Sequence, residues 1–423
     1  MPTAVDSFKA GADSQDVSLF RDIPFFLNML SFDYLCSECG QDFDIVPGLM
    51  LCPQCSSVKK ADEPLRGVLE VRLQGKAPSS FEPLDLLPVE REHFPDLPVG
   101  NTPLWKSSRL CEASGFRSLY LKDDGLNPTG SFKDRASMLV AAFARKHGIQ
   151  EVVVASTGNA GSSMSGVGAA AGLKVKLFLP QTAPPAKMIQ ALQYGADVIM
   201  AEKNYDQAFA LSLEYSDRYG GLNRNTAYNP LTIEGKKTVS IEMWQQLGSC
   251  PDRVYVSVGD GVILSGVYKG FRDLHQLGLI DKVPVIVGVQ AEGSDAITRA
   301  LETGQFDVKA SKTIADSISV DVPSNGYLAV KNLKTYQGCC VTVSDDEILK
   351  AQHELSSTAG VFAEPASATA YAGFLKEKSN LDPKTVCVLL LTGNGLKDVK
   401  AASNIINIPK HPINSLDELN LNH

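Results

Sequence analysis

The chain has 423 residues, of which 44% are hydrophobic and 21% charged, with a formal net charge of −8. Such a composition is that of a globular protein large enough for two or three domains. The acidic balance and the absence of a long basic run argue against bulk attraction to nucleic acid or to anionic membranes. No run of about 18 apolar residues and no secretory signal pattern occurs, so we expect a cytoplasmic protein without a membrane span.

Two CxxC pairs lie near the start of the chain, after a predicted tail over residues 1–30. Their cysteines are Cys36, Cys39, Cys52 and Cys55. Four thiolates at this spacing can face one tetrahedral ion, which leaves no open position for catalysis. We therefore expect a structural zinc ribbon over residues 31–60, with a rubredoxin-like iron site and unligated thiols as alternatives. Residues 34–57 contain no lysine or arginine, which disfavours a module that binds nucleic acid.

Residues 60–100 are rich in proline and predict an irregular, extended arm. Beyond them, short β-branched runs alternate with amphipathic stretches, which predicts a doubly wound α/β fold around parallel sheets. The predicted strands are 118–121, 151–155, 174–178, 197–200, 253–258, 285–290 and 386–391. The predicted helices include 163–171, 185–194, 235–247 and 345–358. Ligands of such folds bind at the carboxyl ends of the strands.

One lysine, Lys133, follows a turn rich in glycine and proline and precedes an apolar helical run. A lysine in this position can be partly desolvated, which lowers its pKa and frees its amine for a Schiff base with an aldehyde. The alternative is an ordinary lysine at a helix start, held by Asp134.

Two other turns follow predicted strands and can share a cleft with Lys133. The turn 156–163 offers hydroxyls, a side-chain amide and free backbone N–H groups, which suit a carboxylate, although simple N-capping is the alternative. The turn 258–266 places glycines at 259 and 261 before a helix, which suits a phosphate group.

Five motifs occur in the order and spacing of the threonine synthase family: GLNPTGSFKDR, ASTGNAGSS, SVGDGVILSG, FAEPASA and LLLTGNGLKD. The chain therefore resembles, over residues 95–400, the fold-type II enzymes that use pyridoxal 5′-phosphate. The resemblance implies two doubly wound parallel-sheet domains. These are a small domain over 131–235 and a large domain over 236–410, with 61–130 as an arm and first part of the large domain and 411–423 as a tail. It also implies a small amino-acid substrate and a homodimer.

The resemblance further implies a role for individual residues. Lys133 would carry the cofactor and then move protons. Asn159 would bind the cofactor's ring hydroxyl, and Thr392 its pyridine nitrogen. Backbone amides of the glycine-rich turn would hold the cofactor phosphate, namely those of Gly259, Asp260, Gly261, Val262 and Ile263. The substrate carboxylate would bind Ser156, Thr157 and Ala160. A hydroxyl facing the ring nitrogen suits elimination and replacement better than transamination.

Threonine synthases convert O-phospho-L-homoserine and water to L-threonine and phosphate, and this is the leading expectation for the chain. The sequence departs from the family's phosphate-binding segment N-S-V-N-P-x-R-x-E-G-Q-K-T, because TAYNPLTIEGKKT stands here. Thr226 and Ala227 replace Asn-Ser, Thr232 replaces the arginine, and Asp260 brings a carboxylate into the cofactor loop. Arg224, Lys187 or Lys236 are the candidates to compensate.

These departures keep other activities open. One alternative is a cysteate synthase-like β-replacement. Another is a serine/threonine dehydratase or a diamino-acid ammonia-lyase, in which Asp260 would face a substrate ammonium. An interaction protein tethered through the cysteine module is the rival outside the enzymes.

Overall fold

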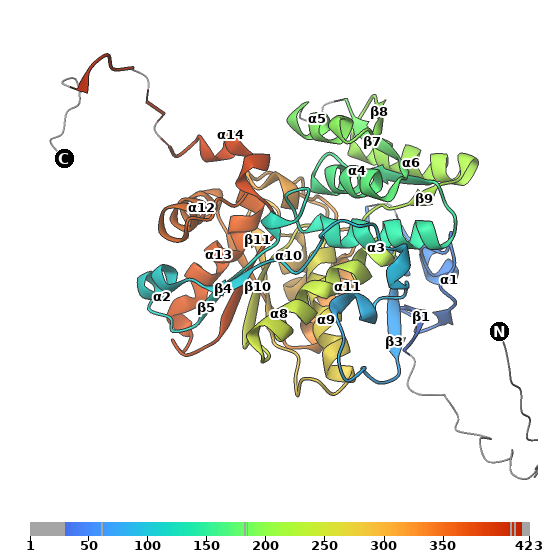
Figure 1. Cartoon of the computed structure of the whole chain (residues 1–423), viewed down its shortest axis with the longest axis horizontal. Coiled ribbons are helices and arrows are strands. Elements are labelled where there is room, and N and C mark those ends of the chain that lie inside the picture. Colours follow the sequence, from blue (N-terminus) through green and yellow to red (C-terminus); the bar gives the residue numbers. More distant parts are fainter. Residues whose placement is uncertain are drawn as a thin grey trace, which may run out of the picture.

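The computed structural model describes residues 30–60, 62–181, 183, 185–406, 408–409 and 412–416. Residues 1–29 of the predicted N-terminal tail lie outside the described residues, as do 411 and 417–423 of the C-terminal tail and the side chain of Lys187. Two parallel sheets with flanking helices form the body, and a small antiparallel sheet carries the cysteines (Figure 1). In the described part of the chain, no helix has the length and apolarity needed to cross a bilayer.

The larger sheet has six strands in the order β12-β11-β10-β13-β5-β4. Its strands are parallel except for β4, which pairs antiparallel to β5. Central β13 is buried throughout, as expected for a strand that helices cover on both faces. The bounds are β4 (Leu104–Lys106), β5 (Leu119–Asp123), β10 (Arg253–Ser257), β11 (Val285–Ala291), β12 (Cys339–Val343) and β13 (Cys387–Leu391).

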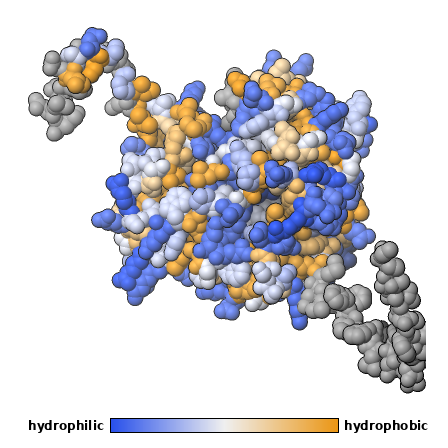
Figure 2. All heavy atoms as spheres, in the orientation of Figure 1, coloured by the Kyte–Doolittle hydropathy of each residue, from blue (hydrophilic) through white to orange (hydrophobic). Residues whose placement is uncertain are grey.

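The smaller sheet has four parallel strands in the order β8-β7-β6-β9. All of its strands fall inside the range 131–235 that we predict for the small domain. The bounds are β6 (Glu151–Ala155), β7 (Lys174–Pro180), β8 (Asp197–Ala201) and β9 (Leu222–Asn223). Exposed apolar side chains gather over the neighbouring α5 and β8, where Ile189, Leu192 and Met200 reach solvent (Figure 2).

Helices cover both sheets, and α3 packs closely on α4 while α12 packs on α13. The bounds are α2 (Ser108–Ser114), α3 (Lys133–Lys146), α4 (Asn159–Ala171), α5 (Pro185–Gln193), α6 (Tyr205–Tyr219), α7 (Leu231–Glu234), α8 (Thr238–Leu247), α9 (Val262–Gln276), α10 (Ala296–Thr303), α11 (Gly326–Thr335), α12 (Asp345–Ala359), α13 (Pro365–Glu377) and α14 (Val399–Ala402).

A short 3-10 helix, η4 (Gly235–Lys237), is wedged between α3 and α9. A Cβ atom at Gly235 would lie 2.4 Å from the Arg135 carbonyl oxygen, and one at Gly270 would lie 2.3 Å from the Lys237 carbonyl oxygen. Both contacts are too short for any side chain, so glycine lets these backbones touch. These contacts fix η4 against the first turn of α3 and the middle of α9.

The cysteine module is a three-stranded antiparallel sheet with one short helix, α1 (Pro53–Ser56). Its strands are β1 (Ser31–Cys36), β2 (Asp42–Phe43) and β3 (Leu69–Gln74). All six residues of β3 pair with β1, so the prediction of an irregular arm over 60–100 is wrong for this stretch. The alternation in LEVRLQ is short and follows several prolines and glycines, which concealed the strand.

Polar contacts fasten this module to α9 and α11. Lys331 Nζ donates to the Ser37 carbonyl oxygen at 2.6 Å, Arg272 pairs with Glu70 at 2.7 Å, and Gln276 Nε2 donates to the Leu73 carbonyl oxygen at 2.7 Å. The module is therefore a fixed part of the body and joins α9 and α11.

The seven predicted strands all occur, with ends that differ by at most two residues. The predicted helix over 163–171 begins earlier, at Asn159, because the turn before it is shorter than expected. The strands of the cysteine module were not predicted, and in the two larger sheets β4, β9 and β12 were missed, of which β4 has only three residues. β9 has only two residues, and β12 is a half-exposed edge strand without a long apolar run.

Candidate active site

Lys133 is the first residue of α3. The turn before it is tied to the end of β13, because Phe132 N donates to the Thr392 carbonyl oxygen at 2.9 Å. Asp134 accepts hydrogen bonds from the backbone N–H and the hydroxyl of Thr129, the former at 2.8 Å. Asp134 is therefore committed to the turn and does not hold Lys133.

The amine of Lys133 lies in a half-buried position among charged groups. Burial lowers its pKa from the ordinary value, Asp260 and Glu364 oppose that shift, and Arg224 adds to it. A lysine with a lowered pKa is more often neutral and nucleophilic. Because Asp260 belongs to the glycine-rich turn, its charge acting on the amine indicates that Lys133 and this turn lie near each other.

The glycine-rich turn connects β10 to α9. A Cβ atom at Gly259 would lie 2.8 Å from the Ile318 Cα, and Gly261 has a φ of 85°, in the left-handed region. Glycine at 259 therefore lets the Ile318 backbone approach closely, and the cradle that the turn forms with the N–H groups at the helix start fits a phosphate group. The side chains of Val262 and Ile263 are buried, so these two residues offer only backbone.

Asp260 already occupies part of this cradle. Its Oδ1 accepts a hydrogen bond from the Val262 N–H at 3.0 Å, one of the amides expected to hold phosphate. A phosphate group bound at this turn would meet the Asp260 carboxylate, so a nearby positive charge is needed to hold both.

Asn159 begins α4 and is linked to the surroundings of Lys133 through Glu364, whose charge acts on the lysine. Its Nδ2 donates to the Glu364 carboxylate at 2.9 and 3.1 Å, while its buried Oδ1 has no hydrogen-bond partner. An unpartnered buried polar atom is uncommon and suits a ligand that donates or accepts there. Glu364 precedes α13, and a Cβ atom at Gly393 would lie 2.1 Å from its Oε1, so glycine makes room for this carboxylate.

The remaining predicted site residues lie at the carboxyl ends of β6 and β13. Thr392 is buried and its N–H donates to the Ser367 hydroxyl at 2.8 Å. Ser156 and Thr157 are half-buried in the turn before α4, whereas Ala160 is buried. The Ser156 hydroxyl accepts from the Gly158 N–H at 3.2 Å, which leaves the rest of the turn open to a ligand.

Two cations, considered at first only as possible compensation, belong to this site. Arg224 follows β9, is fully buried, and donates from Nη1 to the Thr226 hydroxyl at 2.8 Å. Burial lowers its pKa to about 10. Lys236 lies in η4, is fully buried, and donates to the Thr232 carbonyl oxygen at 2.7 Å.

The burial of Lys236 lowers its pKa well below the ordinary value, and Arg224 and Lys133 lower it further. Tyr205 is a third addition to the site. Burial of its hydroxyl raises its pKa, and the charge of Asp260 raises it too. Sequence patterns held no direct signal for these three residues, because their approach to Asp260 depends on contacts between distant segments.

Thr232, which stands where the resemblance expects an arginine, closes a turn instead. Its hydroxyl donates to the Asn229 carbonyl oxygen at 2.7 Å and accepts from the Ala227 N–H at 3.2 Å. Ala227 has a φ of 65°, a strained value for alanine that these bonds help to hold. The Thr232 side chain is thus part of the scaffold.

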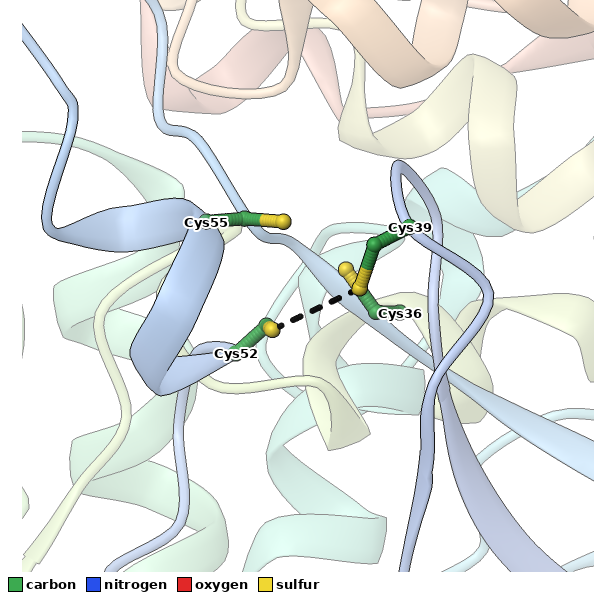
Figure 3. Close-up of side chains that lie close together, drawn as sticks. All are labelled: Cys36, Cys39, Cys52 and Cys55. Atoms are coloured by element: carbon green, nitrogen blue, oxygen red, sulfur yellow. Dashed lines mark hydrogen bonds between the residues drawn. The ribbon is translucent and has the colours of Figure 1, made fainter.

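The four cysteines of the CxxC pairs converge from the β1–β2 turn and from the start and end of α1 (Figure 3). Their Sγ atoms lie within 4.8 Å of one another, and those of Cys39 and Cys52 are 3.8 Å apart. None of the cysteines forms a disulfide. Such a cluster of thiols can hold a metal ion.

The cysteine module also shares an apolar cluster with the start of α9, next to the glycine-rich turn. Val68 and Leu51 pack in one apolar cluster with Ala227, Ile233 and Val262, the first residue of α9. The cysteine module and the residue that follows the glycine-rich turn therefore share one apolar cluster.

Comparison with known proteins agrees with this geometry. The model of the family described as "Pyridoxal-phosphate dependent enzyme" matches residues 96–393. A threonine synthase of Methanosarcina acetivorans is 34% identical over 88% of this chain and 94% of its own length. That of Methanocaldococcus jannaschii is also 34% identical, over 87% and 93%.

Solved structures show the same fold. A threonine deaminase isoform of Solanum lycopersicum has a TM-score of 0.62 at 23% identity, covering 71% of this chain and 87% of that one. Maize serine racemase has a TM-score of 0.64 at 20% identity, covering 72% and 91%. The motifs, the cleft and the relatives agree, and the chain belongs to the pyridoxal-phosphate dependent enzymes as a threonine synthase-like lyase.

Proposed function

We propose that this enzyme converts O-phospho-L-homoserine and water to L-threonine and phosphate. The observation that carries the proposal is the half-buried amine of Lys133, with a lowered pKa, in one cleft with the glycine-rich turn and Asn159. Relatives that carry the name threonine synthase and match most of the chain support the choice of substrate.

We assign each residue of the cleft a role in that reaction. The turn at Gly259, Gly261 and the start of α9 would hold the cofactor phosphate, and Lys133 would bind its aldehyde. When bound, pyridoxal phosphate withdraws electrons from the substrate and makes its α- and β-carbons acidic. Lys133 Nζ then moves the protons at these carbons, for which a partly neutral amine is suited.

Other groups orient the reactants. The turn formed by Ser156, Thr157 and Ala160 would take the substrate carboxylate through its N–H groups and hydroxyls. Asn159 Oδ1 would accept a hydrogen bond from the cofactor ring, and Thr392 would face the ring nitrogen. A threonine there does not stabilise a protonated ring as a carboxylate does, which favours elimination and replacement.

A second candidate follows from Asp260 and Thr232. The arginine expected for substrate phosphate is absent and a carboxylate is present, so a dehydratase, an ammonia-lyase or a cysteate synthase-like replacement is the alternative.

The deciding experiment measures phosphate released from O-phospho-L-homoserine by the purified holoenzyme, with threonine identified as the other product. Parallel assays measure ammonia released from serine, threonine and 2,3-diaminopropionate, and sulfite consumed with O-phosphoserine. Ammonia or sulfite turnover without phosphate release from O-phospho-L-homoserine would reject the proposed substrate.

We also propose that the four thiols bind structural zinc. A tetrahedral zinc ion with Zn–S bonds of about 2.3 Å holds its sulfurs about 3.8 Å apart, which matches the separation of Cys39 and Cys52 Sγ. Elemental analysis distinguishes zinc from iron. We also propose that the protein is cytoplasmic, forms a homodimer and has the domain division given above. Light scattering of the purified protein measures its oligomeric state.

A further inference from the structure

Arg224 and Lys236 are two buried cations that lack a matching anion. Both are fully buried, and in the described part of the chain neither lies within ion-pair distance of a carboxylate. Arg224 Nη2 is buried without any hydrogen-bond partner. An uncompensated buried guanidinium is unfavourable, so this pair is arranged for a charged group that completes it.

The contacts of the two residues place them beside the catalytic lysine and the glycine-rich turn. Arg224 Nε donates to the Ser137 hydroxyl at 3.4 Å, one helical turn beyond Lys133 on α3. Lys236 lies against the first turn of α9, since a Cβ atom at Gly266 would be 2.5 Å from the Lys236 Cβ. Both cations therefore lie near the N-terminal halves of α3 and α9.

Asp260 is the carboxylate whose charge acts on this pair. It attracts Arg224, Lys236 and Lys133 electrostatically, while its Oδ1 is held by the Val262 N–H. The single negative charge of Asp260 thus acts on three cationic side chains, those of Arg224, Lys236 and Lys133. A phosphate monoester, with nearly two negative charges at neutral pH, restores the balance better than a single carboxylate does.

We propose that Arg224 and Lys236 form a phosphate-monoester subsite, with Asp260 as its internal counter-charge. The subsite rests on the proposed function and supplies what Thr232 cannot, because the threonine hydroxyl is bound within its turn. Two buried cations repel an ammonium group, so the same arrangement disfavours a diamino-acid substrate. The cofactor and the proposed substrate both carry a phosphate monoester, and the experiment separates them.

The test uses Arg224→Gln and Lys236→Gln, the latter introducing the residue of the resembled segment. Lys174→Gln, exposed at the far end of β7, removes an equal charge as the control. In one arm, apo-protein is titrated with pyridoxal phosphate and with pyridoxal, followed by visible absorbance. In the other, inorganic phosphate competes with O-phospho-L-homoserine on the holoenzyme, and its binding is also followed by calorimetry.

A loss of about tenfold or more in affinity for pyridoxal phosphate, but not for pyridoxal, assigns the subsite to the cofactor. An unchanged cofactor affinity with inorganic phosphate binding weakened by about tenfold or more assigns it to the substrate. Asp260→Asn, which keeps the shape and removes the counter-charge, is expected to tighten whichever phosphate group binds there.

Two results overturn the subsite: variants that bind both phosphate compounds like the Lys174→Gln control, or an Asp260→Asn variant that binds them no more tightly. The second remains decisive if the cation variants fail to fold. Failure of the proposed function is distinguishable, because calorimetry with inorganic phosphate needs no turnover. A protein that releases no phosphate from O-phospho-L-homoserine, yet loses phosphate binding in Lys236→Gln, keeps the subsite and rejects the substrate.

Discussion

Lys236 and Lys237 are consecutive lysines, both fully buried, with opposite surroundings. Lys237 forms ion pairs with Glu234 and, at 2.8 Å, with Asp273. Although burial opposes it, Asp273 and Glu234 raise the pKa of Lys237, whereas burial lowers that of Lys236. The position of the carboxylates, and not burial, thus decides which lysine is structural and which is available to a ligand.

The first turn of α3 repeats this contrast. Arg135 pairs with Asp124 and with Glu242, both at 2.6 Å, and Lys122 joins the same network at 2.7 Å from Glu242. Lys133, two residues before Arg135, has no ion pair in the described part of the chain. Complete ion-pair networks hold the helices and strands together. Lys133, Arg224 and Lys236, which have no ion pair among the described residues, lie next to these networks.

The largest effect is expected from replacing Lys133, the reactive residue among the three cations that lack an ion pair within the described residues. Lys133→Ala removes the amine proposed to bind the cofactor, so we expect loss of the visible absorbance and a fall in kcat/KM of about 10³-fold or more. Lys146→Ala, at the exposed end of α3, is the matched control. Normal cofactor absorbance in Lys133→Ala would refute the assignment.

The next prediction concerns removal of the metal ion that we propose is bound by the four thiols of the CxxC pairs. Chelation under reducing conditions should lower the melting temperature, because ligand binding energy contributes to folding. Cofactor should also dissociate more readily, because Val68 of the cysteine module and Val262 at the start of α9 belong to one apolar cluster. Scanning fluorimetry and absorbance measure both effects, with Cys250→Ser as a control that keeps its metal. An unchanged melting temperature after complete metal loss would contradict this expectation.

Breaking the closed network of Arg135 should cost stability instead of chemistry. Glu242→Gln leaves Arg135 and Lys122 with too little negative charge, and we expect a loss of about 3–5 kcal/mol in unfolding free energy. Urea unfolding measures it, and the exposed Glu202→Gln serves as control. A loss below about 1 kcal/mol, typical of exposed pairs, would show that the network is not structural.

The smallest expected effect concerns pH. The folded-state pKa of Lys236 lies below that of the unfolded chain, so the unfolded chain binds more protons between the two values. The stability of the apo-protein should therefore rise with pH towards about 10.4, by up to about 1.4 kcal/mol per pH unit. Lys236→Gln should flatten this rise.

Lys237 has the opposite sign, because its pKa is raised in the folded state. Its contribution is present below the unfolded-state pKa and is lost as the pH rises through the folded-state value. Unfolding curves of apo wild type and Lys236→Gln between pH 7 and 10 (approximate limits set by the lysine pKa) measure the difference. Equal slopes would show that Lys236 is not perturbed.

Local patterns were enough to predict much of the architecture. The strands β6, β10 and β13 are continuous apolar runs bounded by glycine-rich turns, and each was predicted within two residues. The turns that follow β6, β10 and β13 hold the motifs, so the sequence also predicted which turns carry the candidate site residues. The spacing of the cysteines likewise predicted their cluster.

The unpredicted parts depend on contacts between distant segments. The role of Arg224 depends on Ser137, 87 residues away, and the closed state of Lys237 depends on Asp273, 36 residues away. The hydrophobic periodicity of the sequence carries no information about such contacts between distant residues. In the sequence, Asp260 suggested either repulsion of phosphate or a partner for a substrate ammonium, and the structure adds that its carboxylate accepts a hydrogen bond from the N–H of Val262, the first residue of α9.

The backbone contacts at Gly235 and Gly270 have a consequence for evolving this enzyme towards new substrates. Enlarging either residue would push η4 off its neighbouring helices and take Lys236 with it. Laboratory libraries should therefore leave these glycines fixed and randomise the charged positions 224, 236 and 260. In this scaffold we expect substrate selectivity to change through substitutions that alter the charge at positions 224, 236 and 260, and not through substitutions that enlarge Gly235 or Gly270.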